Sequence, residues 1–575
     1  MTSADGAGEA RPEPVVERAR RPRWPGLLAA AALVTGPALF ALLATPLGHS
    51  YGFNMAWATG FAAALADGAL SPRHLPGLWL GLGGLDFFFY APLPFFLGAA
   101  PQLALGPEWS VHTLFAAAAG LLWALASITF YRLARRFTAP GPAALGALVY
   151  AVLPYHLAVD WFIRQAVGEF AAYVFLPVVA GGIVDVLRHR GLGLGLPLGF
   201  AGLLLSHLPS AFLAGHLFTV VVGVWAVGHR RAALPAIARL VLGVGLGLAA
   251  AAAFWLPAMV LLGDVSPQAL RIPHLSPENW LFFDDRLEPD PQLMGVVGAA
   301  LAGALAAAWL AAAFATPRCR FEVALWTVLP IGVAALMMTA PARPLWESLP
   351  IAAVQFPYRL MILVDLSSAL ACAVLVDAAA RARRPARLAA VAAVAAPLAA
   401  TAIAAGPALD AAAGGRAVRG TAVAMTGAVE YLPPDFGGPI LTELDRRGLG
   451  PWEAPRVVVP RLPEWRAGAA GAGFTVAPRR WTLDCHEGCG AGPIDLAVPF
   501  WRHLRAKTEA GDPVALAAAP ATGLVRLRPP PDARRVVVTL PLHWSERAGL
   551  AASAVGLVGI AWLGVVVRRG RTLRQ

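Results

Sequence analysis

The stretch GLWLGLGGLDFFFYAPLPFFLGAA, residues 77–100, decides how the rest of the chain is arranged. It is apolar enough to enter a membrane, yet glycines and prolines interrupt it and it carries one carboxylate, Asp86. If this segment crosses the membrane, every later loop changes sides. The charged residues that flank the other apolar segments therefore have to settle its orientation.

The composition is that of a membrane protein. The 575 residues are 58% hydrophobic and 14% charged, whereas soluble domains carry about 25% charged residues. Long apolar runs recur from Trp24 to Ala405 and once more near the C-terminus, which predicts a mainly α polytopic membrane protein. The net charge of +12 comes largely from arginine clusters at the ends of these runs, so we expect the lipid bilayer and no nucleic acid as partner.

The arginine clusters fix the orientation of about twelve predicted spans, because positive charge accumulates on the cytoplasmic side. The spans are predicted at 24–46, 110–133, 140–158, 169–187, 191–207, 209–228, 237–261, 293–316, 322–340, 357–379, 386–405 and 548–567. If residues 77–105 do not cross the membrane, all arginine-rich ends of the spans lie on the cytoplasmic side and both termini are cytoplasmic. If they do cross it, this arrangement is lost. We therefore expect a re-entrant or interfacial element there, within a long first external loop, 48–108.

The expected domains follow from these spans. Residues 1–22 form a disordered cytoplasmic tail, 23–405 the transmembrane domain, 406–547 an external periplasmic domain and 548–575 the last span with a basic tail. Short Val- and Trp-rich segments separated by Gly/Pro turns predict a β-sandwich at about 455–541. A carbohydrate-binding or lid role and a passive cap are both left open. In this domain a Cys485–Cys489 disulfide is favoured over a metal site.

Polar residues gather in the external loops and at the outer ends of the spans, where they are costly. Asp86 and Glu169 flank strongly apolar sequence and are the catalytic candidates. The candidate substrate-binding residues are His49, Asn54, Arg73, His74, Arg164, Gln165, His207, Gln355 and Arg359. Each has a structural alternative: arginines anchor at interfaces, and histidines are often satisfied at helix ends. We find no P-loop, HExxH or GxSxG motif of a soluble enzyme.

Several motifs occur in a specific order along nearly the whole chain. The first external loop, GHSYGFNMAWATGFAAALADGALSPRHLPGLWLGLGGLDFFFYAPLPFFLGA, is followed by RQAVGEF, LLLSHLPSAFL, VQFPYRLMIL and EYLPPDF. Together they resemble bacterial multipass proteins called membrane 6-pyruvoyl-tetrahydropterin synthase-related proteins, which are similar to GT-C glycosyltransferases. The resemblance implies a GT-C-like fold and sugar transfer from polyprenyl-phosphate donors at the outer membrane face.

The chain departs from this family at one important place. GT-C enzymes use an acidic residue of the first external loop as base or to position a metal. By position, that acid falls on Ser50 and its histidine partner on Asn54. A serine hydroxyl does not accept a proton at neutral pH, so Asp86 or Glu169 would have to act instead.

Two hypotheses result. The first is a glycosyltransferase of the bacterial inner membrane that passes sugar from a polyprenyl-phosphate donor to an envelope glycan or lipid. Arg73, Arg164 or Arg359 would neutralise the phosphate; a divalent metal is left open and no other cofactor is expected. The second is a non-catalytic scaffold that binds lipid-linked glycan, its acid lost at Ser50. A transporter is a weaker option, since the spans carry few buried charges, namely Asp365 and Asp377.

Overall fold

The computed structural model describes most of the chain. The described residues are 24–43, 48–188, 191–265, 276–284, 291–348, 354–380, 384–413, 431–433, 472–520 and 522–572. The predicted N-terminal tail, 1–22, and most of the segment 406–471 lie outside them. Statements about the structure below refer to these residues.

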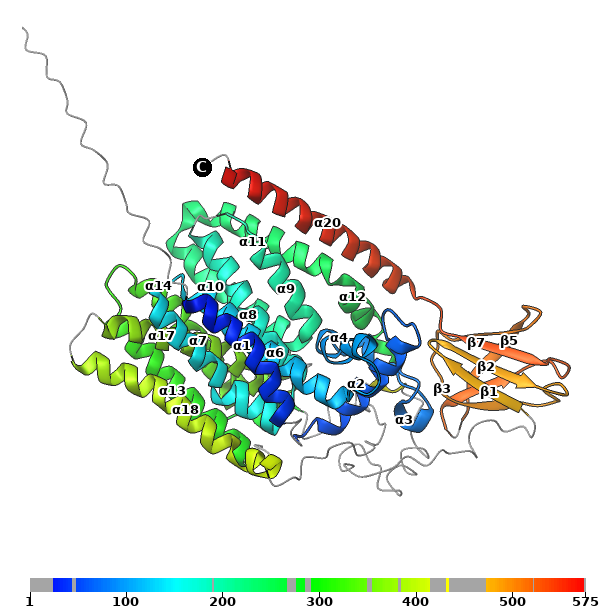
Figure 1. The fold of residues 1–575 in the computed structure, drawn as a ribbon. Helices are drawn as coiled ribbons and strands as arrows, with labels where there is room; N and C mark the ends of the chain where they lie inside the picture. The colour runs from blue at the N-terminus through cyan, green and yellow to red at the C-terminus, as the bar shows by residue number, and fades with distance from the viewer. Residues whose placement is uncertain are drawn as a thin grey trace, which may run out of the picture.

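A bundle of helices forms most of the molecule (Figure 1). Its main helices are α1 (Trp24–Leu43), α6 (Val111–Ala134), α7 (Pro140–Val152), η2 (Pro154–Ile163), α8 (Val167–Leu187), α9 (Gly195–Ser206), α10 (Leu208–Gly228), α11 (Arg230–Ala250), α12 (Ala252–Val260), α13 (Pro291–Phe314), α14 (Arg320–Trp326), α15 (Val328–Met337), α17 (Met361–Ala379), α18 (Arg384–Ala413) and α20 (Trp544–Thr572). Short elements between them are η3 (Leu262–Asp264), η6 (Pro277–Trp280), η7 (Ala340–Ala342), α16 (Arg343–Ser348) and η9 (Pro357–Leu360).

Among the described residues, 11 helices are long and apolar enough to cross a membrane, so the chain is a multi-pass membrane protein. Every predicted span contains a helix. One of these helices, α9, is too short to span the membrane by itself: its 12 residues extend about 18 Å, whereas the hydrocarbon core is about 30 Å thick. It packs between α8 and α11, so neighbouring helices compensate for its shortness.

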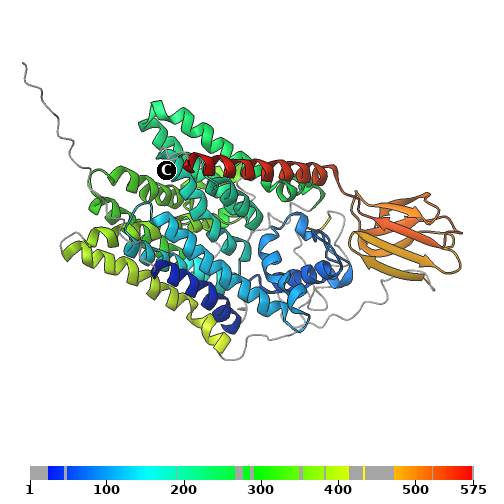
Figure 2. The ribbon, with the colours of Figure 1, turned by 45° about the horizontal axis from the view of Figure 1, so that its top comes forward.

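The opening stretch does not form a spanning helix. It is divided into α3 (Leu78–Gly81), η1 (Asp86–Phe88), α4 (Leu93–Ala99) and α5 (Pro101–Leu105). Together with α2 (Tyr51–Ala66), α3 and α4 lie between the bundle and the C-terminal sheet (Figures 1 and 2). Gly83 shows why the chain turns here: its φ is +88°, and a Cβ would lie 2.6 Å from His74 Nε2. The segment is thus a compact element at one end of the bundle.

Cysteine labelling tests the predicted orientation. In Leu103→Cys, whose position is 56% exposed, a membrane-impermeant maleimide is expected to react in intact cells. Cys319, which is exposed between α13 and α14, supplies an internal control, because it should react only after permeabilisation. Labelling of position 103 solely in permeabilised cells would contradict the orientation, since it would reverse the first external loop.

The C-terminal region contains one antiparallel seven-stranded sheet with strand order β1-β2-β7-β4-β5-β6-β3. The strands are β1 (Ala472–Ala477), β2 (Arg480–Cys485), β3 (Ile494–Pro499), β4 (Arg505–Thr508), β5 (Pro513–Ala518), β6 (Leu524–Arg528) and β7 (Arg535–Thr539). The sequence predicts a sandwich of two sheets, whereas this half-barrel curls so that one face encloses the core. Alternating buried residues in β2 and β7 line that core.

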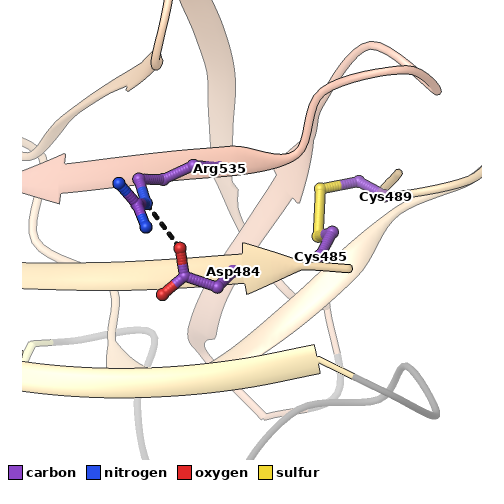
Figure 3. Close-up of a disulfide and its surroundings, with 4 residues drawn as sticks. All are labelled: Asp484, Cys485, Cys489 and Arg535. Atoms are coloured by element: carbon purple, nitrogen blue, oxygen red, sulfur yellow. Dashed lines mark hydrogen bonds and ion pairs between the residues drawn. A yellow bond between two sulfur atoms is a disulfide. The ribbon is translucent and has the colours of Figure 1, made fainter. Parts of the chain in front are cut away.

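The disulfide lies at the end of β2 (Figure 3). Cys485 and Cys489 are bonded, with 5.1 Å between their Cα atoms. Beside them Arg535 on β7 donates to Asp484 on β2, which ties the same strand end to its neighbour. The bridge therefore closes the turn that leaves β2.

Candidate functional site

Arg164 lies at the centre of a buried charged cluster. Its Nη1 donates to the Tyr155 hydroxyl at 3.0 Å, to Asp160 Oδ1 at 2.9 Å and to Glu169 Oε2 at 2.9 Å. The Tyr155 hydroxyl in turn donates to Glu169 Oε1 at 2.8 Å. We call Tyr155, Asp160, Arg164, Glu169 and Arg359 the Arg164 cluster. Buried charges of this kind are costly within a membrane protein and usually serve a function.

An unusual helix places these residues together. The segment Pro154–Ile163 is a π-helix of 10 residues, and the amide of Arg164 still bonds the carbonyl five residues back, at 2.7 Å. π-Helical turns are rare and occur mostly at functional sites. Gln165 then adopts φ +52° and ends the helix, so that α8 starts in a new direction with Glu169 in its first turn. Asp160 and Glu169 consequently approach Arg164 from two helices.

Arg359, in the short helix η9 just before α17, completes the cluster from the other side. Its Nε lies 3.6 Å from Glu169 Oε2, which is an ion pair but too long for a hydrogen bond. Its Nη1 donates to the Val354 carbonyl and to Gln355 Oε1, the latter at 3.2 Å. Nε is buried without a hydrogen-bond partner among the described residues. Nε and Nη2 form the side of a guanidinium that binds carboxylate or phosphate in a bidentate manner.

The first external loop contacts this cluster through its backbone. The amide of His49 bonds the Ile163 carbonyl, and the amide of Ser50 bonds the Arg164 carbonyl, both at 2.9 Å. Asn54 Nδ2 donates to the Gln165 carbonyl at 2.6 Å. The position where the family resemblance places its acid, Ser50, therefore adjoins the segment that carries Arg164. The two external loops form one site.

His207 lies between α9 and α10 and borders the same region. Its Nδ1 accepts a hydrogen bond from the Ser210 amide at 3.3 Å, so the ring caps α10. Burial, and then the positive charges of Arg359 and Arg164, hold the pKa of His207 well below its ordinary value. The ring therefore stays neutral, and it contributes a polar edge rather than a charge.

Asp86 lies in a different environment, although it is also buried. Its Oδ1 accepts a hydrogen bond from Trp57 Nε1 of α2 at 3.1 Å. The guanidinium of Arg164 pairs with Asp160 and Glu169. Glu169, the other carboxylate singled out in the sequence, thus lies against both Arg164 and Arg359.

Arg73 and His74 lie where the first external loop packs against the half-barrel. Arg73 donates to the carbonyls of Phe87 and Ala253 at 2.8 and 2.6 Å. The His74 ring packs edge-on against Trp481 of β2, with 4.8 Å between ring centroids. Burial and the nearby Arg479 lower the pKa of His74 to about 3. His74 therefore packs the loop against the half-barrel, whereas Arg73 joins the loop to α12 through the Ala253 carbonyl.

The carboxylates of the cluster do not fit a divalent metal. Asp160 and Glu169 each point one oxygen at Arg164, whose guanidinium lies where a shared cation would have to bind. Among the described residues no group of three or more His, Cys, Asp or Glu side chains could hold a metal ion. The groups that the structure brings together at this site are arginine, tyrosine, histidine and carboxylate side chains.

The structure adds members to the predicted site. The sequence places Asp160 among the polar residues of the second external loop and Tyr358 at the entry to the span 357–379, but neither was singled out as a candidate, and Tyr155 was not considered. The spacing of polar residues in the segment YHLAVDWFIRQ does carry a signal: Tyr155, Asp160 and Arg164 are separated by five and four residues. That spacing keeps the three on one face only if the helix winds more widely than an α-helix.

Buried polar atoms without partners concentrate at this site. Among the described residues, nine buried side-chain polar atoms make no hydrogen bond, and five of them belong to the cluster or border it. These five atoms are Asn54 Oδ1, His156 Nε2, Asp160 Oδ2, Gln165 Nε2 and Arg359 Nε. Buried polar groups are normally hydrogen-bonded, so a group of exceptions at one place indicates a binding site.

No protein-family model and no curated protein matches this chain, so the resemblance to the pyruvoyl-tetrahydropterin synthase-related family has no support from either comparison. Similar solved structures include the cryo-EM structure of arabinofuranosyltransferase AftD from Mycobacteria, with TM-score 0.39 and 19% identity over 69% of this chain. A mutant of that enzyme gives TM-score 0.40 and 18% identity over 76%. The chain covers only 27% and 32% of those two chains, and a likeness at this level carries no inference about activity.

Proposed function

We propose that this protein is a GT-C-type membrane glycosyltransferase that transfers sugar from a polyprenyl-phosphate donor to an envelope glycan or lipid. The observation that supports it most is Nε of Arg359, which is buried and makes no hydrogen bond with a described residue, although it forms a 3.6 Å ion pair with Glu169. A guanidinium edge of this kind, next to a second arginine, suits a phosphate ester beside a sugar. The site would face the outer side of the bacterial inner membrane, with the termini cytoplasmic and the half-barrel periplasmic.

The chemistry assigned to the site is a single displacement. The acceptor hydroxyl loses its proton to a carboxylate, its oxygen attacks the anomeric carbon, and the bond from that carbon to the phosphate oxygen breaks. The electron pair leaves with the polyprenyl phosphate, whose charge Arg359 and Arg164 stabilise. The configuration at the anomeric carbon is inverted. Glu169 remains a candidate for the base, whereas Asp86 would act from the neighbouring first loop.

A second function has one observation in its favour. Glu169 is fully buried and accepts from Tyr155 and Arg164, so in this conformation it is poorly placed to take a proton. A non-catalytic protein that binds lipid-linked glycan would need only the arginines. Introducing Ser50→Asp separates the two functions, because binding without any gain of transfer would favour the non-catalytic one.

The phosphate assignment is tested with Arg359→Leu. Loss of a bidentate, charge-assisted contact should weaken binding of farnesyl phosphate to the vesicle-reconstituted protein by about 10- to 100-fold. Tryptophan fluorescence titration measures this affinity, because Trp280 packs against Tyr358 beside Arg359, with ring centroids 5.4 Å apart.

A matched control is Arg188→Leu, which removes an arginine that pairs with Glu322 at 2.6 Å outside the Arg164 cluster. Its affinity for farnesyl phosphate should stay at the wild-type value. Equal affinities for the wild type and Arg359→Leu would exclude Arg359 from the phosphate site and remove the main support for the proposed function.

A further inference from the structure

Two of the unpartnered atoms belong to one helix and have the same hydrogen-bonding character. His156 and Asp160 are four residues apart on the π-helix η2, and positions four and five apart share a face of such a helix. Both side chains are fully buried. His156 Nε2 and Asp160 Oδ2 make no hydrogen bond with any described residue.

The proton on His156 can be placed from its other nitrogen. Nδ1 lies 2.8 Å from the Tyr150 carbonyl oxygen, and a carbonyl only accepts, so Nδ1 carries the proton. Nε2 of the neutral ring is then an acceptor. The ring cannot turn easily, because it stacks on Tyr173 with centroids 3.7 Å apart and 4° between the planes.

A buried carboxylate from another helix fixes the same segment. Asp365 Oδ2, on α17, accepts from the His156 amide at 3.1 Å and from the Tyr173 hydroxyl at 2.8 Å. It therefore holds the start of η2 and the stacked ring in one position. Arg359, six residues earlier in η9, connects the segment that leads into α17 to the Arg164 cluster. We regard Asp365 as a positioning residue.

Asp160 differs from Glu169 in how its oxygens are used. Oδ1 of Asp160 accepts from Arg164, whereas Oδ2 is free of protein donors among the described residues. Both oxygens of Glu169 accept hydrogen bonds, from Tyr155 and from Arg164. A carboxylate that has one oxygen unoccupied can take a proton without first breaking an ion pair.

We propose that His156 Nε2 and Asp160 Oδ2 form a subsite for a hydroxyl group, and that Asp160 is the base that deprotonates the sugar acceptor. This inference rests on the proposed function. Two buried acceptors need a ligand that donates, and an alcohol O–H meets that need. The O–H bond breaks, its proton passes to Asp160 Oδ2, and the oxygen keeps the electron pair with which it attacks the anomeric carbon. Arg359, at 12% the most exposed charged side chain of the cluster, marks the side from which the ligand approaches.

The test is Asp160→Asn in the full-length protein reconstituted in vesicles. Asparagine has the shape of aspartate and can still accept from Arg164 through Oδ1, so the fold should be retained. Transfer from a panel of polyprenyl-phosphate pentoses and hexoses to octyl glycosides should fall by about 10²- to 10⁴-fold. Binding of farnesyl phosphate should stay at the wild-type value, and the detergent unfolding midpoint should fall less than in Arg164→Met, because Arg164 keeps its ion pair with Glu169. A purely structural residue would not produce a loss of transfer with retained binding of farnesyl phosphate.

Three further variants test whether the loss of transfer is specific to Asp160. Asp185→Asn, at a partly exposed pair with Arg136, is the matched control and should transfer sugar normally. Glu169→Gln should retain more transfer than Asp160→Asn. His156→Phe keeps the stacking on Tyr173 but removes Nε2, so it should slow transfer and alter the pH dependence of the rate without weakening farnesyl phosphate binding.

Each outcome decides the inference. Transfer by Asp160→Asn within about threefold of the wild type would overturn it, as would a larger loss in Glu169→Gln. If the wild type binds farnesyl phosphate yet transfers none of the sugars, the base assignment fails while binding of a lipid phosphate stands. If the wild type neither binds nor transfers, the proposed function itself fails.

Discussion

Arg164→Met is expected to lower the free energy of unfolding by about 3–5 kcal/mol, the cost of removing one partner from a buried ion pair. The change leaves Asp160 and Glu169 buried without their shared cation, and the Tyr155 hydroxyl loses a donor. Methionine fills a similar volume, so a cavity does not explain the loss. Unfolding in a titration with sodium dodecyl sulfate, followed by tryptophan fluorescence, measures the effect.

Arg188→Met is the control for this prediction. Arg188 also pairs with a carboxylate, Glu322, but the two side chains are 24% and 34% exposed. Partly exposed pairs contribute about 0–1 kcal/mol, so the unfolding midpoint should hardly move. Similar losses in the two variants would mean that Arg164 has no special structural role.

Acidification from pH 7 to 4 is expected to destabilise the contact between the first external loop and the half-barrel by about 3 kcal/mol. The pKa of His74 is lowered to about 3 in the folded protein, whereas an unfolded histidine titrates near 6.5. Above pH 6.5 both states are neutral and nothing is lost. As the pH falls through 6.5, the unfolded state binds a proton that the folded state excludes, and stability declines until about pH 3.

His74→Phe isolates this contribution, because the ring can still pack against Trp481 but cannot be protonated. Other titrating groups cross the same contact. His503 Nε2 lies 2.7 Å from Asp264 Oδ2, so the difference between wild type and variant is the informative quantity. Limited proteolysis from pH 7 to 4 should show the wild type becoming sensitive while His74→Phe changes less. Parallel curves for the two proteins would refute the role of His74.

Much of the fold follows from hydropathy and arginine placement. Spans and their order could be predicted because a bilayer requires about 20 apolar residues for each crossing. The interruption of 77–105 by Gly83 and by prolines could be predicted for the same reason, since no uninterrupted helix of sufficient length fits. The arrangement of the half-barrel was harder to predict from the sequence. Alternating apolar and polar residues predict strands, but whether seven strands form one curled sheet or two stacked sheets depends on long-range strand pairing.

The candidate site was only partly predictable. Glu169, Arg164 and Arg359 stand out as charges beside apolar sequence, and the structure brings them together. Asp160 was recognised only as a polar residue of the second external loop, and Tyr155 was not considered, because hydropathy does not reveal the π-helix that turns both toward Arg164. Arg73 and His74 were grouped with the site because they share a loop with Asp86. His74 packs instead against Trp481 of the half-barrel, and Arg73 donates to the Phe87 and Ala253 carbonyls. A charged residue beside apolar sequence indicates that its side chain has an interaction partner. Which residue that partner is depends on tertiary contacts, which the sequence does not show.

The wide winding of Pro154–Ile163 has a consequence for sequence length. In an α-helix each residue advances the direction of the side chains by about 100°. Deleting a single residue between His156 and Ile163 would let this segment relax to α-helical winding while the span kept its apolar character. The side chain of Arg164 would then point in a different direction around the helix axis, away from Glu169 on α8. One insertion or deletion can therefore separate the two carboxylates from their arginine without altering the hydropathy of the segment.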